Sequence, residues 1–257
     1  MISLQVVDSF TDVPFKGNPA AVTVLDHFPP DDCMQAVARE MNLSETAYVV
    51  RRADGDYDLR WFTPAAEVDL CGHATLASAH VLGGSARFHT NGGVLACKSG
   101  AGGLIWMDFP ADPPRPEPVP PALAEAKPLV CARGRYDLLI ELPDPEAVRI
   151  FVPDLAAIAG LDCRGLIITA AGGTEGIDFT SRVFAPSLGI PEDPVTGSAH
   201  CTLACFWAER LGRTSLTGFQ ASQRGGTVKM QLAGDRVKVG GHAVTVSEVR
   251  LLASSFA

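Results

Sequence analysis

The sequence lacks several features that mark common classes of protein. None of its apolar runs approaches the roughly 18 residues of a membrane-spanning helix. The start, MISLQVVDSF, has no basic stretch followed by a long apolar one, so we expect no secretory signal peptide. The seven cysteines are dispersed, without Cys-x-x-Cys pairs. This pattern favours reduced thiols and a cytoplasmic location over a disulfide framework.

Positive charge is also scarce. The 21 basic residues form no run and are outnumbered by 29 acidic ones, which gives a formal net charge of −8. A chain of this sign has no electrostatic reason to bind nucleic acid or an anionic membrane. The glycine-rich stretches GAGG (100–103) and AGGTEG (171–176) lack the preceding strand and following helix of a dinucleotide loop, and no P-loop pattern occurs. We therefore expect no organic cofactor.

What the sequence does have is an internal repeat. Each half gives the same predicted order: strands, a short helix, strands, a loop, a helix of small apolar residues, and closing strands. The two central helices are HATLASAHVLG (73–83) and AHCTLACFWAERLG (199–212), and they align Gly72-His73-Ala74 with Gly197-Ser198-Ala199. The proline-rich segment 110–121 between the halves cannot join a central sheet and behaves as a spacer.

These patterns predict an α+β fold of two pseudo-symmetric domains. The strands follow one another too closely for βαβ alternation, so each domain should be a curled, mainly antiparallel sheet wrapped around its central helix. We place the N-terminal domain at 1–112 and the C-terminal domain at 113–245. The alternative in which the C-terminal strand, 246–257, returns to the first domain stays open.

The starts of the two central helices are the predicted ligand-binding elements. The first amides of a helix lack intrahelical acceptors, and the helix dipole adds partial positive charge there. Gly72 and Gly197 permit a close approach to the backbone, which suits a carboxylate or phosphate. If the halves are related by pseudo-two-fold symmetry, both helix starts can bind one small acid. The simpler interpretation is that Asp193 and Ser198 only cap a buried helix.

Four separated motifs carry a resemblance to a known family: DVPFKGNPAAV (12–22), NLSETAYV (42–49), DLCGHATLASAHVL (69–82) and EDPVTGSAH (192–200). Together they resemble the PhzF family of phenazine biosynthesis, relatives of diaminopimelate epimerase. The resemblance spans essentially the whole chain. It implies a diaminopimelate epimerase-like fold and a biosynthetic, cofactor-independent isomerase that moves a proton on a small carboxylate substrate in the interdomain cleft. The named reaction of the family isomerises a dihydro-hydroxyanthranilate, and a homodimer is expected.

The resemblance also assigns candidate site residues. Glu45 matches the catalytic acid/base of the family, although a loop glutamate is otherwise most often a solvated charge. His73 opens the first helix, where it can bind substrate or a neighbouring acid. Asp193 is interpreted as a catalytic partner for a substrate amine or hydroxyl. The predicted substrate-binding residues are Asn18, Gly72, Gly197, Ser198, Gln223 and Arg224, although a glycine-flanked arginine such as Arg224 is more often turn surface.

Cys71 separates the proposed mechanism from that of the epimerases. Those relatives carry one cysteine before each helix, whereas here Cys71 fills the first position and Thr196 the second. A threonine hydroxyl is too weak an acid to replace a thiolate, so a one-base transfer by Glu45 is favoured and Cys71 is interpreted as packing. An epimerase that uses Cys71 and a non-catalytic small-acid binding protein remain the alternatives. His200, Cys201 and Cys205 share a helix, but packing is favoured over metal ligation, and we predict no metal site.

Overall fold

The computed structural model describes residues 2–252, which form two compact units. The first contains the described residues up to Asp108 together with those from Gly240 onward, and the second contains Phe109–Val239. The boundaries fall within β8 (Ile105–Pro110) and β17 (Arg236–Gly241). The chain therefore leaves the first unit once and returns to it once.

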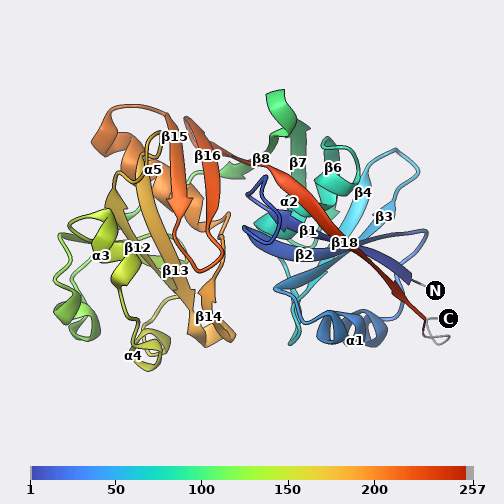
Figure 1. Ribbon diagram of the computed structural model, residues 1–257, viewed down its shortest axis with the longest axis horizontal. Coiled ribbons are helices and arrows are strands. Elements are labelled where there is room, and N and C mark those ends of the chain that lie inside the picture. Colours follow the sequence, from blue (N-terminus) through green and yellow to red (C-terminus); the bar gives the residue numbers. More distant parts are fainter. Residues whose placement is uncertain (1, 253–257) are drawn as a thin grey trace. The chain divides into compact units, whose positions relative to one another are not determined.

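The first unit holds two longer helices and most of the strands of the N-terminal half (Figure 1). In chain order its elements are β1 (Ile2–Ser9), β2 (Asn18–Leu25), α1 (Asp31–Met41), β3 (Glu45–Arg51), β4 (Tyr57–Phe62), β5 (Glu67–Val68), α2 (Gly72–Val81), β6 (Ala86–Thr90), β7 (Gly93–Ser99), the first part of β8 and, at the other end of the chain, β18 (Ala243–Leu251).

The two helices of this unit are buried differently. In α1 the apolar residues Met34 and Val37 pack with Tyr48 and Phe62, whereas the opposite side is exposed. In α2 every residue from 73 to 79 is buried, and the helix contacts β1, β2, β3 and β18. A helix that is apolar nearly all round is stable only when it is enclosed. The sequence HATLASAHV therefore forms the central helix that the pattern predicts.

The second unit repeats this arrangement with its own elements. They are β9 (Arg115–Pro116), β10 (Val130–Arg133), β11 (Asp137–Glu141), α3 (Pro145–Ile150), α4 (Leu155–Ala159), β12 (Gly165–Ala171), β13 (Phe179–Ala185), β14 (Ile190–Asp193), α5 (Ala199–Leu211), β15 (Ser215–Gln220), β16 (Gly226–Ala233) and most of β17. Helix α5 is buried over most of its length and exposed in its last three residues, and its C-cap is Gly212, whose φ of +64° lies in the left-handed region that favours glycine at a helix C-terminus.

Strand pairing reproduces the internal repeat. Going along the first unit, β1–β2 is antiparallel, β2–β3 parallel, β3–β4 antiparallel, β4–β6 parallel and β6–β7 antiparallel. The pairs β10–β11, β11–β12, β12–β13, β13–β15 and β15–β16 have the same directions in the same order. The predicted α+β fold of repeated, curled and mainly antiparallel sheets is confirmed.

Two helix starts have local explanations. The six-residue helix α3 was not predicted from the sequence; Asp144 caps it by accepting a hydrogen bond from the amide of Ala147 at 2.8 Å. In α1, Pro30 occupies the cap position, and Asp31 and Asp32 lie in the first helical turn, where their charge complements the helix dipole.

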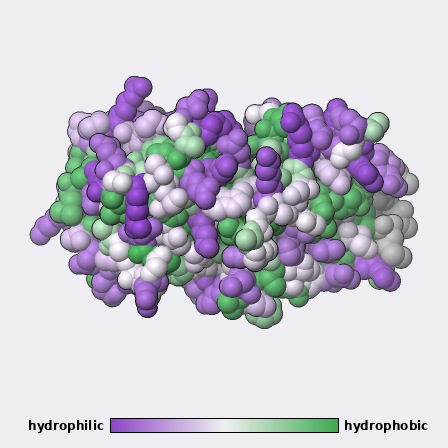
Figure 2. Space-filling model, turned by 90° about the horizontal axis from the view of Figure 1, so that it is seen from above, coloured by the Kyte–Doolittle hydropathy of each residue, from purple (hydrophilic) through white to green (hydrophobic). Residues whose placement is uncertain are grey.

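The surface is mixed in polarity. On the face drawn in Figure 2, hydrophilic side chains separate small hydrophobic groups. Within residues 2–252, no helix combines the length and the apolar character needed to cross a membrane.

Candidate active site

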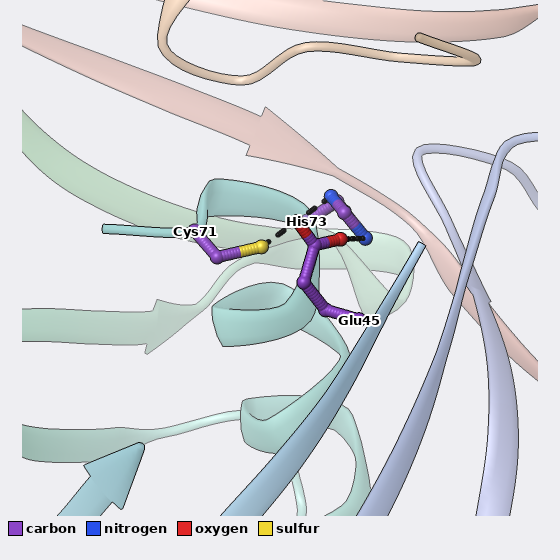
Figure 3. A group of neighbouring side chains, drawn as sticks. All are labelled: Glu45, Cys71 and His73. Atoms are coloured by element: carbon purple, nitrogen blue, oxygen red, sulfur yellow. Dashed lines mark hydrogen bonds and ion pairs between the residues drawn. The ribbon is translucent and has the colours of Figure 1, made fainter. Parts of the chain in front are cut away.

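Three chemically reactive side chains meet at the start of α2 (Figure 3). Glu45 is the first residue of β3, His73 the second residue of α2, and Cys71 occupies the N-cap position of that helix. The parallel pair β2–β3 aligns Glu45 with Ala20, and α2 packs against both strands. The start of the helix therefore lies beside the start of β3. Glu45 is 8% exposed and His73 5% exposed, so both potential charges are removed from water.

The imidazole of His73 lies between the other two groups. Its Nε2 is 2.9 Å from Oε2 of Glu45, and its Nδ1 is 3.6 Å from Sγ of Cys71. Nε2 and Oε2 are close enough for an ion pair but are not aligned for a hydrogen bond. Both atoms are buried and have no hydrogen-bond partner among the described residues. Buried polar atoms left in this state are costly. A ligand that approached them could supply the missing hydrogen bonds.

Burial and the neighbouring groups together shift the pKa values of both His73 and Cys71 upward. Burial alone would lower the pKa of His73, but the thiolate form of Cys71 and the carboxylate of Glu45, acting through charge and hydrogen bonding, outweigh burial and raise the pKa well above its usual value. Burial, with a further contribution from the charge of Glu45, raises the pKa of Cys71 to about 11. At neutral pH Cys71 is therefore a thiol, which does not suit it to act as a base. Its contact with His73 nevertheless goes beyond the packing that the sequence predicted.

Further hydrogen bonds hold this half-site in place. Ser9 donates through Oγ to the carbonyl of His73 at 2.8 Å. Asn18, one of the predicted binding residues, is fully buried at the start of β2 and accepts a hydrogen bond from Ser44, next to Glu45, at 3.0 Å. Gly17, which precedes Asn18, has a φ of +64°, and a Cβ there would collide with the carbonyl oxygen of Ser9. The loop from β1 to β2 thus needs a glycine at that position.

The arrangement suits proton transfer better than metal binding. Donor atoms of Glu45, Cys71 and His73 all lie within 4.8 Å of one another, a spacing that a metal ion can use. However, the Cys71 thiol faces Nδ1 and the Glu45 carboxylate faces Nε2. An ion bound to Nδ1 would have the imidazole ring between it and Glu45, and an ion bound to Nε2 would have the ring between it and Cys71. A metal site would require the ring to turn. As it stands, the ring can exchange hydrogen bonds with both neighbours.

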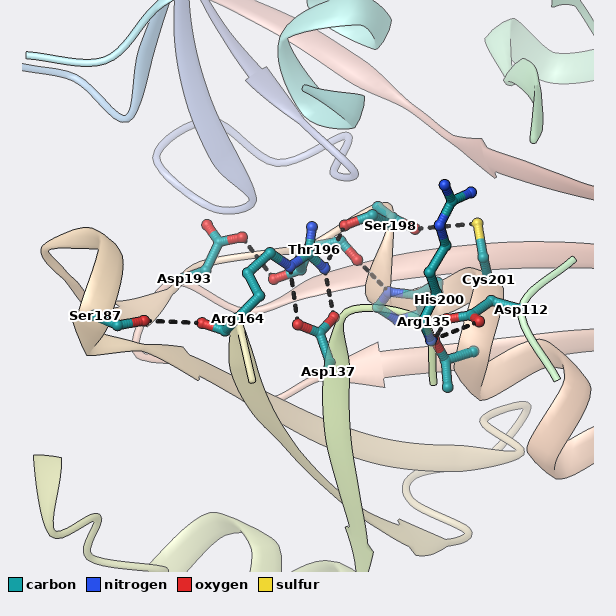
Figure 4. A network of polar contacts seen from close by, with 12 residues as sticks. Asp112, Arg135, Asp137, Arg164, Ser187, Asp193, Thr196, Ser198, His200 and Cys201 are labelled. Atoms are coloured by element: carbon teal, nitrogen blue, oxygen red, sulfur yellow. Dashed lines mark hydrogen bonds and ion pairs between the residues drawn. The ribbon is translucent and has the colours of Figure 1, made fainter. Parts of the chain in front are cut away.

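In the second unit, the predicted residues Asp193 and Ser198 lie near the start of α5 (Figure 4). Asp193 ends β14, and its Oδ2 accepts a hydrogen bond from the hydroxyl of Thr196 at 2.5 Å. Gln220, which is fully buried, accepts from the amide of Thr196 at 2.9 Å and donates to the carbonyl of Asp193 at 2.7 Å. It fixes the loop that carries Gly197. Sequence reasoning missed Gln220, because one glutamine at the end of a strand carries no local signal.

Ser198 does not cap α5, contrary to the simpler interpretation. It occupies the N-cap position, but its side chain makes no capping hydrogen bond. Its Oγ instead accepts a hydrogen bond from Nη2 of Arg164 at 3.1 Å. Arg164 in turn forms a two-pronged ion pair with Asp137, in which Nε donates to Oδ1 at 2.9 Å and Nη2 donates to Oδ2. Neither residue was singled out from the sequence.

The remaining predicted residues lie in the turn after β15. Gln223 is exposed and Arg224 is partly buried. Their neighbour Ser222 donates through Oγ to the carbonyl of Pro194 at 2.7 Å, which ties this turn to the loop of Asp193. The structure thus groups Asn18, Glu45, Gly72 and His73 in the first unit, and it groups Asp193, Gly197, Ser198 and the turn of Gln223 and Arg224 in the second.

Comparison with known proteins agrees with the motifs. The model of the PhzC-PhzF family, described as phenazine biosynthesis-like protein, matches residues 7–110 and 121–249. A protein of Halalkalibacterium halodurans named an uncharacterized isomerase is 47% identical over 97% of this chain and 98% of its own length. The crystal structure of a PhzF family protein from Enterococcus faecalis has a TM-score of 0.91 at 41% identity, covering 96% of this chain and 97% of that one. A hydroxyproline epimerase from Agrobacterium vitis, with a TM-score of 0.60 at 10% identity over 96% of this chain and 91% of its own, shares the fold.

Proposed function

Because this chain belongs to the phenazine biosynthesis-like PhzC-PhzF family and is an isomerase, we propose that it moves a proton between two carbons of a small carboxylate substrate, with Glu45 as the general acid/base. The observation that carries the proposal is the buried contact of Glu45 with His73, 2.9 Å apart. General acid–base catalysis requires a carboxylate held in a fixed position, and the contact with His73 supports such a position for Glu45.

The reaction can be written with all atoms and electrons balanced. The carboxylate of Glu45 takes a proton from a carbon of the substrate, and the C–H electron pair enters the conjugated system that includes the carboxylate or a neighbouring double bond. The protonated Glu45 then returns the proton to a second carbon, and the double bond shifts. Nothing is oxidised or reduced, and no co-reactant is consumed.

His73 would act on the charge that develops in this reaction. Its raised pKa favours the protonated imidazole, which can stabilise the anion formed when the carbon loses its proton. The same positive charge balances the carboxylate of Glu45 before the reaction. We include in the proposal that the start of α2 contributes to binding the acid, so variants at Gly72 should weaken the affinity for it.

Proton exchange tests the proposal without knowledge of the natural substrate. The wild-type protein is incubated in D2O with a panel of cyclic amino acids and hydroxy acids, and loss of carbon-bound protons is followed by NMR. Glu45→Gln should lower the exchange rate by at least about a hundredfold and leave ligand binding largely intact. Glu40→Gln, at an exposed position of α1, is the matched control and should exchange like the wild type.

Two results would contradict the proposal. Full exchange in the Glu45→Gln variant would exclude Glu45 as the proton carrier. Tight binding of acids by the wild type with no exchange in any of them would favour the alternative of a non-catalytic binding protein.

A further inference from the structure

The ring of His73 has one orientation in which both of its nitrogens face polar groups. Its Nδ1 lies 3.6 Å from Sγ of Cys71, and its Nε2 lies 2.9 Å from Oε2 of Glu45 (Figure 3). A half turn about the bond from Cβ to the ring would place carbon atoms against the thiol and the carboxylate. The only hydrogen-bonding partner of the ring among the described residues is the sulfur of Cys71. The contact with the thiol therefore favours the observed orientation.

Cys71 is itself held in place at the start of α2. It is 6% exposed and occupies the N-cap position. Its carbonyl accepts hydrogen bonds from the amide of Thr75 at 3.2 Å and from the hydroxyl of Thr75 at 2.5 Å. Ser9 donates to the carbonyl of His73 at 2.8 Å. The sulfur and the imidazole are thus both attached to backbone that hydrogen bonds hold in position.

A thiol can serve both protonation states of this ring. Sulfur is a weak acceptor, so it can accept a hydrogen bond from Nδ1 when the imidazole carries two protons. The S–H group is a weak donor, so it can donate to Nδ1 when the imidazole is neutral, and the single ring proton then lies on Nε2. As long as Cys71 faces Nδ1, Nε2 of His73 is protonated in either state.

A proton that stays on Nε2 matters for the neighbouring carboxylate. Once Glu45 has taken a proton from the substrate, an unprotonated Nε2 at 2.9 Å would be a base next to it and could accept that proton. A protonated Nε2 cannot accept it and remains a donor, to the carboxyl group or to a ligand. The proton on Glu45 then has no route to the imidazole and is returned to the substrate.

We propose that Cys71 is a positioning residue, which engages Nδ1 of His73 and so keeps a proton on Nε2. This inference rests on the proposed function, because it concerns the proton that Glu45 carries. In this role Cys71 acts through His73 and takes no part in the proton transfer itself. The role differs both from packing and from the epimerase alternative, in which the cysteine is a base.

NMR of the full-length protein labelled with 15N measures where the ring proton lies. In the wild type the carboxylate of Glu45 also favours a proton on Nε2, because it can only accept hydrogen bonds. The test therefore uses Glu45→Gln, since an amide can donate or accept. Long-range 1H–15N spectra are recorded while the pH is raised until His73 is neutral. The signal that disappears when His73→Gln is added identifies His73 among the six histidines.

The Glu45→Gln protein should show neutral His73 with its proton on Nε2. Adding Cys71→Ala should give nitrogen shifts averaged between the two tautomers, because neither neighbour then selects one. Cys71→Val, which fills the space of the thiol without a donor or an acceptor, should have the same effect. Cys71→Ser should shift the signal back toward the Nε2-protonated form, since a hydroxyl both donates and accepts. Cys97→Ala, at another buried thiol, is the matched control and should leave the signal unchanged.

Two results would overturn the inference. A neutral His73 in Glu45→Gln with its proton on Nδ1 is the first, and it requires no change at Cys71. The second is a proton that stays on Nε2 after Cys71→Ala or Cys71→Val, which would reduce Cys71 to packing. Because no substrate enters this test, its result is separate from that of the proposed function, which fails if proton exchange persists without Glu45.

Discussion

Nε2 of His73 lies 2.9 Å from Oε2 of Glu45, and neither atom has a hydrogen-bond partner among residues 2–252. Replacing His73 by Gln should therefore leave the carboxylate buried without a cation. We expect the proton-exchange rate to fall at least about tenfold and the free energy of unfolding to fall by roughly 3 kcal/mol. Exchange in D2O and urea denaturation measure the two effects. His80→Gln, on the same helix but bonded to Thr245, is the control and should show neither loss.

Two buried histidines should give opposite dependences of stability on pH. His73 has a raised pKa in the folded state, so its contribution is fully present below the unfolded pKa of about 6.5 and is lost as the pH rises through the higher folded value. The free energy of unfolding of the wild type minus that of His73→Gln should therefore shrink as the pH rises above 6.5. A difference that grows over this range would contradict the assignment.

His200 should behave in the other direction. Burial lowers its pKa to about 4, against a weaker opposing effect of its hydrogen bond to the carbonyl of Thr196. Its contribution to stability is present above pH 6.5 and is lost as the pH falls toward 4, at roughly 1.4 kcal/mol per pH unit. His200→Asn removes the titrating group, so its stability should fall less steeply between pH 6.5 and 4. Parallel curves for the two proteins in urea denaturation would be the contrary result.

Cys71 should be dispensable as a base. Because its pKa is about 11, Cys71→Ala should retain proton exchange within about tenfold of the wild type, and iodoacetamide should not label Cys71 in the folded protein at neutral pH. Mass spectrometry after alkylation and the D2O exchange assay check both statements. Cys97→Ala, at another buried thiol, is the control. Loss of exchange as complete as in Glu45→Gln would instead support the epimerase alternative.

The core of the second unit should depend on Trp207. This residue of α5 is 2% exposed, stacks on Phe179 with ring centroids 5.9 Å apart, and donates through Nε1 to Thr169 at 3.0 Å. Trp207→Ala should lower the free energy of unfolding by about 3–5 kcal/mol through loss of packing. Trp207→Phe keeps an aromatic ring and loses the hydrogen bond, so a loss of only about 1–2 kcal/mol is expected. Equal losses in urea denaturation would show that the hydrogen bond, not the packing, dominates.

The sequence was most informative where structure depends on local signals. The central helices α2 and α5 are apolar on nearly all sides, and glycines follow their ends, so their existence and their burial could be predicted. The internal repeat followed from the order of the elements. Helix α3 was missed because six residues are too few to show a helical period.

The network around α5 could not be predicted for a different reason. Arg164 and Ser198 are 34 residues apart, and Arg164 and Asp137 are 27 apart. They meet because β11 and β12 pair in parallel with one particular register, which no short stretch of sequence specifies. Ser198 and Asp193 were noticed through a motif, whereas Arg164, Asp137 and Gln220 belong to none.

The pairing of β1 with β18, from Ile2 opposite Leu251 to Ser9 opposite Ala243, has a consequence for biosynthesis of the polypeptide. All strands of the second unit leave the ribosome before β18 does, so that unit can fold during translation. The nascent first unit must wait with one side of β1 unpaired, a state that is prone to association with other chains. The half containing Glu45 can therefore complete its sheet only after β18 has been synthesised.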